Sequence, residues 1–371
     1  MYMNRTIFLL MAIAVLGLAG CQKDDEYSGK GIRFGIMTGT EETKANYSGA
    51  VSTVGSSKYE RIDWAVNDLI RIYCPEASEP AETHYQDYKV TSFSTATNGN
   101  SRGKIAMADV TAEPLQWNDT EGTPHDFFAV YPSPATIGIA SGFGMNESTV
   151  TLAFPGIQTP TGITGSASAG YVAAPDTRYL YMVAKTLDVT EPGTSGNEVF
   201  LEFLPMVTAI EFTITNNYSN HADMKITDVS LQTSASGAKL HGTTSANLAT
   251  AWGATDPVPT FPVPTTGGAT VGIPLGTLSA PLVVNYGKTV TFTFLLPPFA
   301  ATDLTFGITT TTGGTRYTKL STSANVPIEF GARQKHFVQG ILVPEHATWI
   351  VAGNVIVTPW TDQSVNLEFT E

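Results

Sequence analysis

The stretch AIEFTIT at residues 209–215 alternates apolar and polar residues, so that Ile210, Phe212 and Ile214 fall on one side of an extended chain. Successive side chains of a strand point to opposite faces, so this alternation predicts a strand with one buried face. The stretches VTFTF at 290–294 and LTFGIT at 304–309 repeat the pattern. Their β-branched and aromatic residues also favour strands. We expect half-buried antiparallel strands at all three places.

Helical periodicity is almost absent from the rest of the chain. Pro, Gly and Asn clusters separate the apolar stretches, which is typical of turns between strands. The sequence therefore predicts an all-β protein built of β-sandwiches with Greek-key-like connections. A polar, turn-rich segment lies between residues 190 and 198. We expect an N-terminal β-sandwich domain at 31–190 and a C-terminal β-sandwich domain at 198–371.

The first residues have the form of an export signal. Arg5 precedes an apolar run from Ile7 to Leu16, which is too short to span a bilayer as a helix. The run is followed by LAGC at 18–21, which resembles the lipobox of bacterial lipoproteins. We expect residues 1–20 to be a lipoprotein signal peptide and Cys21 to carry the lipid. Two or more acyl chains would then hold the mature protein on the membrane.

Residues 21–30 are expected to form an acidic tether. The cluster directly after Cys21 resembles the surface-export signal of some outer-membrane lipoproteins. A plain solvated tether is the alternative, since charge runs near termini are usually solvated. The residues of the cluster are Lys23, Asp24, Asp25 and Glu26.

Charge and cysteine content exclude some classes of protein. The chain has 20 basic and 33 acidic residues and a net charge of −13, which argues against binding nucleic acid. With Cys21 committed to lipid, Cys74 is the one cysteine left, so no intramolecular disulfide is expected. Stability must therefore come from apolar cores, and the length suffices for two domains.

Catalytic motifs are absent from the sequence. The six histidines form no pair at metal-ligand spacing, and no CxxC, nucleophile elbow or phosphate loop occurs. His125, just before an apolar stretch, is expected to be structural. Cys74 is expected to be a small buried residue. We therefore expect no enzyme, no cofactor and no metal site.

Several short segments stand out along the chain. They are IRFGI at 32–36 followed by TKA at 43–45, WAVNDLI at 64–70, HDFFAVYP at 125–132, FLPMVTAIEF at 203–212, FLLPP at 294–298, GARQKHF at 331–337 and VTPW at 357–360. Each motif is short, but their order spans about 300 residues of the chain. Together they resemble the fimbrillin family, the subunits of type V pili, and specifically its fimbrillin-like lipoproteins.

The resemblance implies two tandem transthyretin-like domains and a structural role in a fimbria that serves cell adhesion. It implies that a lipidated precursor reaches the surface of the outer membrane, where a trypsin-like protease removes the lipid and the first strand. The open groove would accept a strand from the next subunit, either another copy or another pilin. Host or bacterial surface ligands are further expected partners, and the processed protein is expected in the fimbrium.

The resemblance and the strand pattern also assign roles to particular residues. Ile32, Phe34 and Ile36 alternate as the plug strand requires. Cleavage is expected after Lys44, in a polar segment, with Arg61 and Arg33 as alternatives.

At the other end, Val365, Leu367 and Phe369 share one face of the last segment. This is the pattern that a donated strand needs. The same residues could instead form the last strand of their own domain, and the sequence leaves both interpretations open.

Two other roles are compatible with the same fold. The chain could be a permanently lipid-anchored pilus anchor, or a surface lipoprotein that binds glycans. In the second case exposed aromatic side chains would serve as sugar platforms. The aromatic residues considered for this role are Trp117, Trp252, Tyr85 and Tyr88.

Overall fold

The computed structural model describes residues 31–38, 46–54, 57–95, 101–118, 120, 122–191, 198–234, 237–252, 261–302, 304–320, 328–332, 334–343, 355–359 and 365–367. Most of these residues are in β-strands. The helices in this part of the chain are a 3-10 turn, η1 (Thr177–Tyr179), and one short α-helix, α2 (Leu248–Ala251). The predicted all-β class is confirmed.

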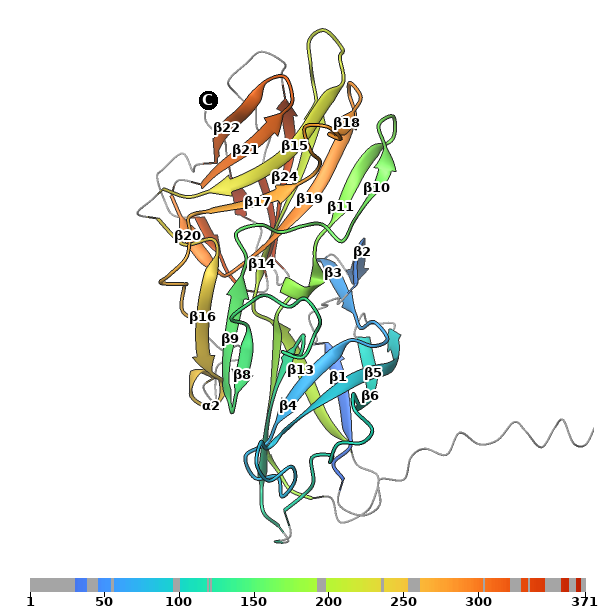
Figure 1. Cartoon of the computed structure of the whole chain (residues 1–371), viewed down its shortest axis with the longest axis vertical. Coiled ribbons are helices and arrows are strands. Elements are labelled where there is room, and N and C mark those ends of the chain that lie inside the picture. Colours follow the sequence, from blue (N-terminus) through green and yellow to red (C-terminus); the bar gives the residue numbers. More distant parts are fainter. Residues whose placement is uncertain are drawn as a thin grey trace, which may run out of the picture.

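Seven strands from residues 34–205 form a closed barrel, the lower body in Figure 1. Its strand order is β1-β13-β12-β7-β4-β5-β6, and β6 pairs back to β1. A closed barrel is one way for a sheet to cover its own apolar face. The strands are β1 (Phe34–Thr38), β4 (Leu69–Tyr73), β5 (Tyr85–Thr95), β6 (Ser101–Met107), β7 (His125–Tyr131), β12 (Met182–Val189) and β13 (Val199–Pro205).

Two facing sheets form the upper body. A seven-stranded sheet has the order β10-β11-β19-β14-β24-β25-β26, and a five-stranded sheet has the order β17-β15-β21-β22 with β18 beside β15. The strands are β10 (Gly162–Ser166), β11 (Gly170–Ala174), β14 (Thr208–Asn216), β15 (Met224–Gln232), β17 (Thr270–Pro274), β18 (Leu282–Val284), β19 (Thr289–Leu296), β21 (Leu304–Thr310), β22 (Gly314–Leu320), β24 (Gln334–Val343), β25 (Val355–Pro359) and β26 (Val365–Leu367).

The core between these two sheets uses the alternation seen in the sequence. Ile210, Phe212 and Ile214 of β14 are fully buried, and Phe306 of β21 stacks on Phe212 with 4.6 Å between ring centroids. The predicted burial of one strand face is therefore confirmed. The pairing is less uniform than expected, because β14 runs antiparallel to β19 but parallel to β24.

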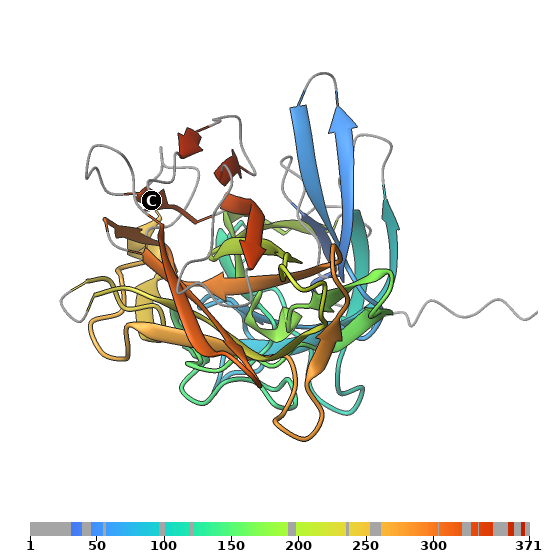
Figure 2. The same ribbon diagram turned by 90° about the horizontal axis from the view of Figure 1, so that it is seen from above.

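Three smaller sheets complete the described fold. One of them, β16-β9-β8, joins segments from the two halves of the sequence along the side of the molecule (Figure 1). The β2–β3 hairpin, blue in Figure 2, projects from the body. The strands are β2 (Asn46–Val54), β3 (Ser57–Asp63), β8 (Gly144–Asn146), β9 (Thr149–Phe154), β16 (Gly242–Asn247), β20 (Phe299–Ala301) and β23 (Ile328–Phe330), the last two paired with each other.

Strand pairing crosses the division expected at residues 190–198. β13 follows that segment but lies in the barrel, paired with β1 and β12. In the opposite sense, β10 and β11 precede it but belong to the seven-stranded sheet. The motif at 203–212 is thus the crossing from one body to the other rather than a strand pair that opens the second. Polar turn residues mark both hairpins and boundaries, so they do not distinguish the two.

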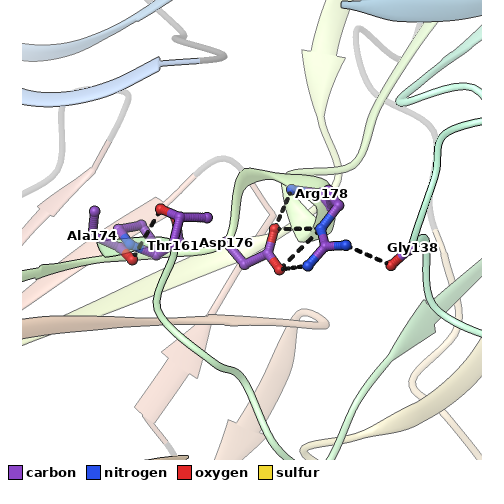
Figure 3. Close-up of polar contacts among 6 residues, drawn as sticks. Gly138, Thr161, Ala174, Asp176 and Arg178 are labelled. Atoms are coloured by element: carbon purple, nitrogen blue, oxygen red, sulfur yellow. Dashed lines mark hydrogen bonds and ion pairs between the residues drawn. The ribbon is translucent and has the colours of Figure 1, made fainter. Parts of the chain in front are cut away.

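A second passage between the bodies runs from β11 through η1 to β12. Figure 3 shows the polar contacts at this turn. The buried carboxylate of Asp176 accepts a hydrogen bond from the backbone N–H of Arg178 and pairs with its guanidinium at 2.5 Å. The same guanidinium donates to the carbonyl of Gly138. These contacts fix the connecting turn against the loop that contains Gly138. Just before β10, the Thr161 hydroxyl donates a hydrogen bond to the carbonyl of Ala174 in β11.

No helix of the part described above is long and apolar enough to cross a membrane.

Candidate functional site

The inward face of the first strand fills the barrel core. Ile32, Phe34 and Ile36 are 2%, 5% and 0% exposed. The ring of Phe34 meets Tyr88 and Phe127 edge to face, at centroid distances of 5.2 and 5.5 Å. Burying three large apolar side chains is worth several kcal/mol, at roughly 1.5–3 kcal/mol each. The first strand is therefore an integral part of the barrel core.

The backbone of β1 closes the barrel between β6 and β13. It runs parallel to β13 from Phe34–Val199 to Thr38–Phe203 and antiparallel to β6 from Gly35–Lys104 to Met37–Arg102. Without β1, both neighbours would present unpaired backbone N–H and C=O groups along a groove. Unpaired strand edges of this kind are templates for pairing with another strand.

Two glycines set how closely β1 packs against its neighbours. A Cβ added at Gly103 of β6 would lie 2.8 Å from Cγ1 of Ile36. At Gly35 of β1, a Cβ would lie 2.6 Å from the ring of Phe200 and 2.9 Å from the carboxylate of Glu198. Glycine inside a strand often marks a close approach of this kind. A glycine within a predicted strand is the sequence signal for this contact, but it does not indicate which strand lies against it.

An open hollow of about 340 Å³ lies against β1. Its polar lining includes Arg102 and Lys104 of β6, both exposed, and the described residues provide no ion pair for either. The exposed rings of Phe93 and Phe200 also line it. The full lining is Ile36, Ser92, Phe93, Ser94, Arg102, Gly103, Lys104, Glu198 and Phe200.

The motif at 64–70 forms the turn that leads into β4. Trp64 is fully buried, with edge-to-face contacts to Tyr131 and Phe203 at 5.4 and 5.3 Å. Asn67 has a φ of 73°, a left-handed conformation that Asn adopts more readily than most residues. Asp68 accepts hydrogen bonds from the Ala65 N–H at 2.7 Å and from the Tyr131 hydroxyl at 3.2 Å. Burial raises the pKa of Asp68 to about 6.

The expected processing sites are only partly described. Cys21, the cluster at 23–26 and Lys44 lie outside the described residues. Arg61 lies in β3, within the projecting hairpin (Figure 2). Arg33 is exposed, but its carbonyl accepts a hydrogen bond from the Val199 N–H at 2.8 Å. Its backbone is therefore held by β13, which does not favour protease access.

The last segment lies in the seven-stranded sheet, away from the barrel. β26 pairs antiparallel with β25 over the register from Val355–Leu367 to Val357–Val365 and forms one end of the sheet order. Val365 and Leu367 are thus placed in a sheet of their own chain, whereas Phe369 lies outside the described residues. An end strand that pairs on one side over three residues is weakly held.

Three of the four aromatic residues considered as sugar platforms are buried, and Tyr85 is half-buried. Trp117 and Trp252 are 5% and 9% exposed and belong to the barrel-side core. Tyr88 is also buried, and the guanidinium of Arg71 lies 4.1 Å from the ring centroid of Tyr85. The sequence does not distinguish these rings from exposed ones, because long-range packing covers them.

Other residues with potential chemistry have structural roles. The ring of His125 is buried: Nδ1 contacts the Thr123 carbonyl at 2.9 Å, and Nε2 accepts from the Asn118 N–H at 3.0 Å. Cys74 is fully buried, and burial raises the pKa of its thiol to about 12. No group of three or more His, Cys, Asp or Glu side chains that could hold a metal ion occurs within the described ranges.

These features define an all-β protein with a barrel that its own first strand closes and a two-sheet second body. A family model described as "Fimbrillin-like" matches residues 52–360. The chain belongs to the fimbrillin-like family, as the sequence motifs indicated.

The chain was also compared with solved structures. A candidate cell adhesion protein from Bacteroides ovatus is 12% identical, with 90% of this chain and 100% of that chain covered and a TM-score of 0.51. A candidate cell adhesion protein from Bacteroides uniformis is 16% identical over 90% and 99% of the two chains, with a TM-score of 0.49. The tip fimbrial protein Mfa3 from Porphyromonas gingivalis is 10% identical over 88% and 99%, with a TM-score of 0.38. No curated protein sequence matches the chain.

Proposed function

We propose that the chain is a structural subunit of a surface fimbria that serves cell adhesion. Membership of the fimbrillin-like family supports this class of function. The solved neighbours carry fimbrial and cell adhesion names. A structural, non-catalytic role also agrees with the packed positions of His125 and Cys74.

The observation that carries the assembly mechanism is the position of β1. It is the first strand of the described chain, and it closes the barrel between β6 and β13. Phe34 and Ile36 of β1, and Ile32 just before it, are buried in the core. Its removal would leave a groove with two free edges and three apolar places. In the proposed mechanism, the next subunit fills that groove with a strand, which gives backbone hydrogen bonds and matched side chains.

Proteolysis after Lys44 would remove the lipid on Cys21 and the plug strand in one step. The segment that contains Lys44 directly follows β1, so a cut there leaves the rest of the barrel intact. The lipid and the residues Lys23, Asp24, Asp25 and Glu26 would serve delivery to the outer surface of the outer membrane. Membrane retention then ends when the subunit is processed.

The donated strand in this mechanism comes from residues 365–371. Among the described strands β26 pairs only with β25, so its release from the described sheet gives up few backbone hydrogen bonds. Val365, Leu367 and Phe369 would take the inward places that Ile32, Phe34 and Ile36 leave. In a subunit outside a fibre, β26 would stay at the edge of its own sheet.

Limited proteolysis of the chain from residue 21 onward, with Cys21→Ser to prevent lipidation, tests the mechanism. We expect a trypsin-like protease to convert the monomer into SDS-resistant polymers whose subunits begin at Ala45. The Lys44→Gln variant should be cut slowly and should polymerise correspondingly slowly.

Two outcomes would contradict the proposal. Fibres from cells that contain only lipidated, uncut subunits would favour a permanent pilus anchor. An absence of polymers after complete removal of β1 would exclude strand exchange by this chain.

A further inference from the structure

The two sides of the β1 groove carry opposite charges on the outer surface. Arg102 and Lys104 are exposed on β6, whereas Glu198 and Glu202 are exposed beside and on β13. In the register of the barrel, Lys104 lies opposite Gly35 and Arg102 lies opposite Met37. The first strand therefore offers neither cation a carboxylate.

Gly35 lies between Lys104 of β6 and Phe200 of β13, because it is registered with both residues. Having no side chain, Gly35 allows the Phe200 ring and the Glu198 carboxylate to lie over the strand. Phe200 is 49% exposed and lines the hollow of about 340 Å³ beside β1. It therefore has room to move when a strand with a side chain at this place enters the groove.

We infer that Lys104 selects an acidic side chain at this place on the strand that replaces β1, and that Glu368 of a second copy provides it. The inference rests on the strand exchange proposed above. When Val365, Leu367 and Phe369 take the places of Ile32, Phe34 and Ile36, the residue at the place of Gly35 is Glu368. Glu198 repels its carboxylate from the β13 side, and Lys104 attracts it to the β6 side.

The apolar side chains of the donated strand favour this register over its neighbours. A shift by one residue turns every apolar side chain outward. A shift by two residues places Glu368 opposite Arg102, at the place of Met37, which is registered with Glu202 on the other side. That shift also puts the polar Gln363 at the inward place of Ile32. The apolar places therefore set the register, and Glu368 acts on the choice of partner.

An exposed cross-strand ion pair has a modest effect on affinity. We expect loss of the charge to weaken binding about two- to fivefold and reversal of the charge to weaken it about tenfold. Effects of this size are measurable with short peptides. They also leave strand exchange itself intact, which makes the inference separable from the proposed function.

The test uses a fluorescent peptide of residues 361–371 and the chain from residue 21 after cleavage and inhibition of the protease. Fluorescence anisotropy gives the affinity of the native peptide and of its Glu368→Gln and Glu368→Lys variants. The Glu371→Gln peptide is the matched control, because it also loses one carboxylate. On the receptor, Lys104→Glu is compared with Lys225→Glu, an exposed lysine of β15 in the other body.

We expect the native and Glu371→Gln peptides to bind equally, and Glu368→Lys to bind about tenfold more weakly. The Lys104→Glu receptor should invert this preference, whereas Lys225→Glu should not change it. Equal affinity of all the peptides for the unmodified receptor would overturn the selection by Lys104 and leave strand exchange in place. Failure of every peptide to bind, together with an absence of polymers, would overturn the proposed function and this inference with it.

Discussion

Burial of the Asp68 carboxylate, which accepts hydrogen bonds from Ala65 and Tyr131, couples the stability of the barrel to pH. The pKa of Asp68 is raised from 3.8 to about 6, so the native state retains a proton between these pH values that the unfolded state has released. This contribution to stability is complete below about pH 4 and is lost as pH rises through about 6. The expected loss is on the order of 2 to 3 kcal/mol.

The Asp68→Asn variant should lack this dependence, because its amide does not titrate. Urea unfolding between pH 4 and 7, followed by tryptophan fluorescence, measures the difference from the unmodified chain. Asp109→Asn, at an exposed loop carboxylate, is the control. Parallel pH profiles for the unmodified and Asp68→Asn chains would contradict this account of Asp68.

Gly103 allows Ile36 of the first strand to lie directly against β6. A Cβ at this position would meet Cγ1 and Cδ1 of Ile36 at 2.8 and 2.9 Å, and Ile36 is fully buried. We expect Gly103→Ala to destabilise the barrel by about 1 to 3 kcal/mol, as overpacking does. Gly144→Ala is the matched control, since no atom lies within 4 Å of its added Cβ. Equal midpoints of urea unfolding for both variants would show that the close contact between Gly103 and Ile36 does not affect the stability of the barrel.

The Gln158 side chain forms the backbone hydrogen bonds that a neighbouring strand would otherwise form at the end of β19. Its buried amide donates to the Leu295 carbonyl at 2.6 Å and accepts from the Leu295 N–H at 3.0 Å, beyond the point where β11 ends its pairing with β19. Its own N–H donates to Gly272 of β17 at 2.9 Å. One residue thus joins the two sheets of the upper body.

Replacement of Gln158 by Met would leave both polar groups of Leu295 unpaired in a buried place. We expect the chain to lose about 2 to 4 kcal/mol of unfolding free energy. Gln232→Met, at an exposed position of β15, is the control. A thermal midpoint unchanged by Gln158→Met would exclude this bridging role.

The sequence allowed the strand faces to be predicted but not the strand partners. Burial of Phe212, Phe292 and Phe306 follows from local alternation, because the period of two is a property of each strand alone. The pairing of β13 with β1 depends on residues far apart in the chain, and no local pattern contains it. Burial of Trp252 has the same origin, since long-range packing covers the ring. The position of Lys104 opposite Gly35 could not be predicted either, because it depends on the pairing of β1 with β6.

At the scale of the whole molecule, the two bodies are built from interleaved segments of the sequence. β13 follows residue 198 and completes the barrel. β16, at residues 242–247, pairs with β9. Residues 31–190 expressed alone therefore lack both. We expect this fragment to show no cooperative unfolding transition, in contrast to residues 31–371. Native-like near-ultraviolet circular dichroism from the fragment would contradict the interleaving.

The parallel pairing of β1 with β13 also governs the order in which the barrel can close as the chain is synthesised from its N-terminus. β1 has no complete binding place until Ser101–Met107 and then Val199–Pro205 have followed it. β1 therefore lacks one of its two partner strands until more than half of the chain has been made. The last step in closing the barrel is thus the insertion of β1 between β6 and β13. In the proposed strand exchange, assembly of a fibre would repeat this insertion with a strand from another molecule.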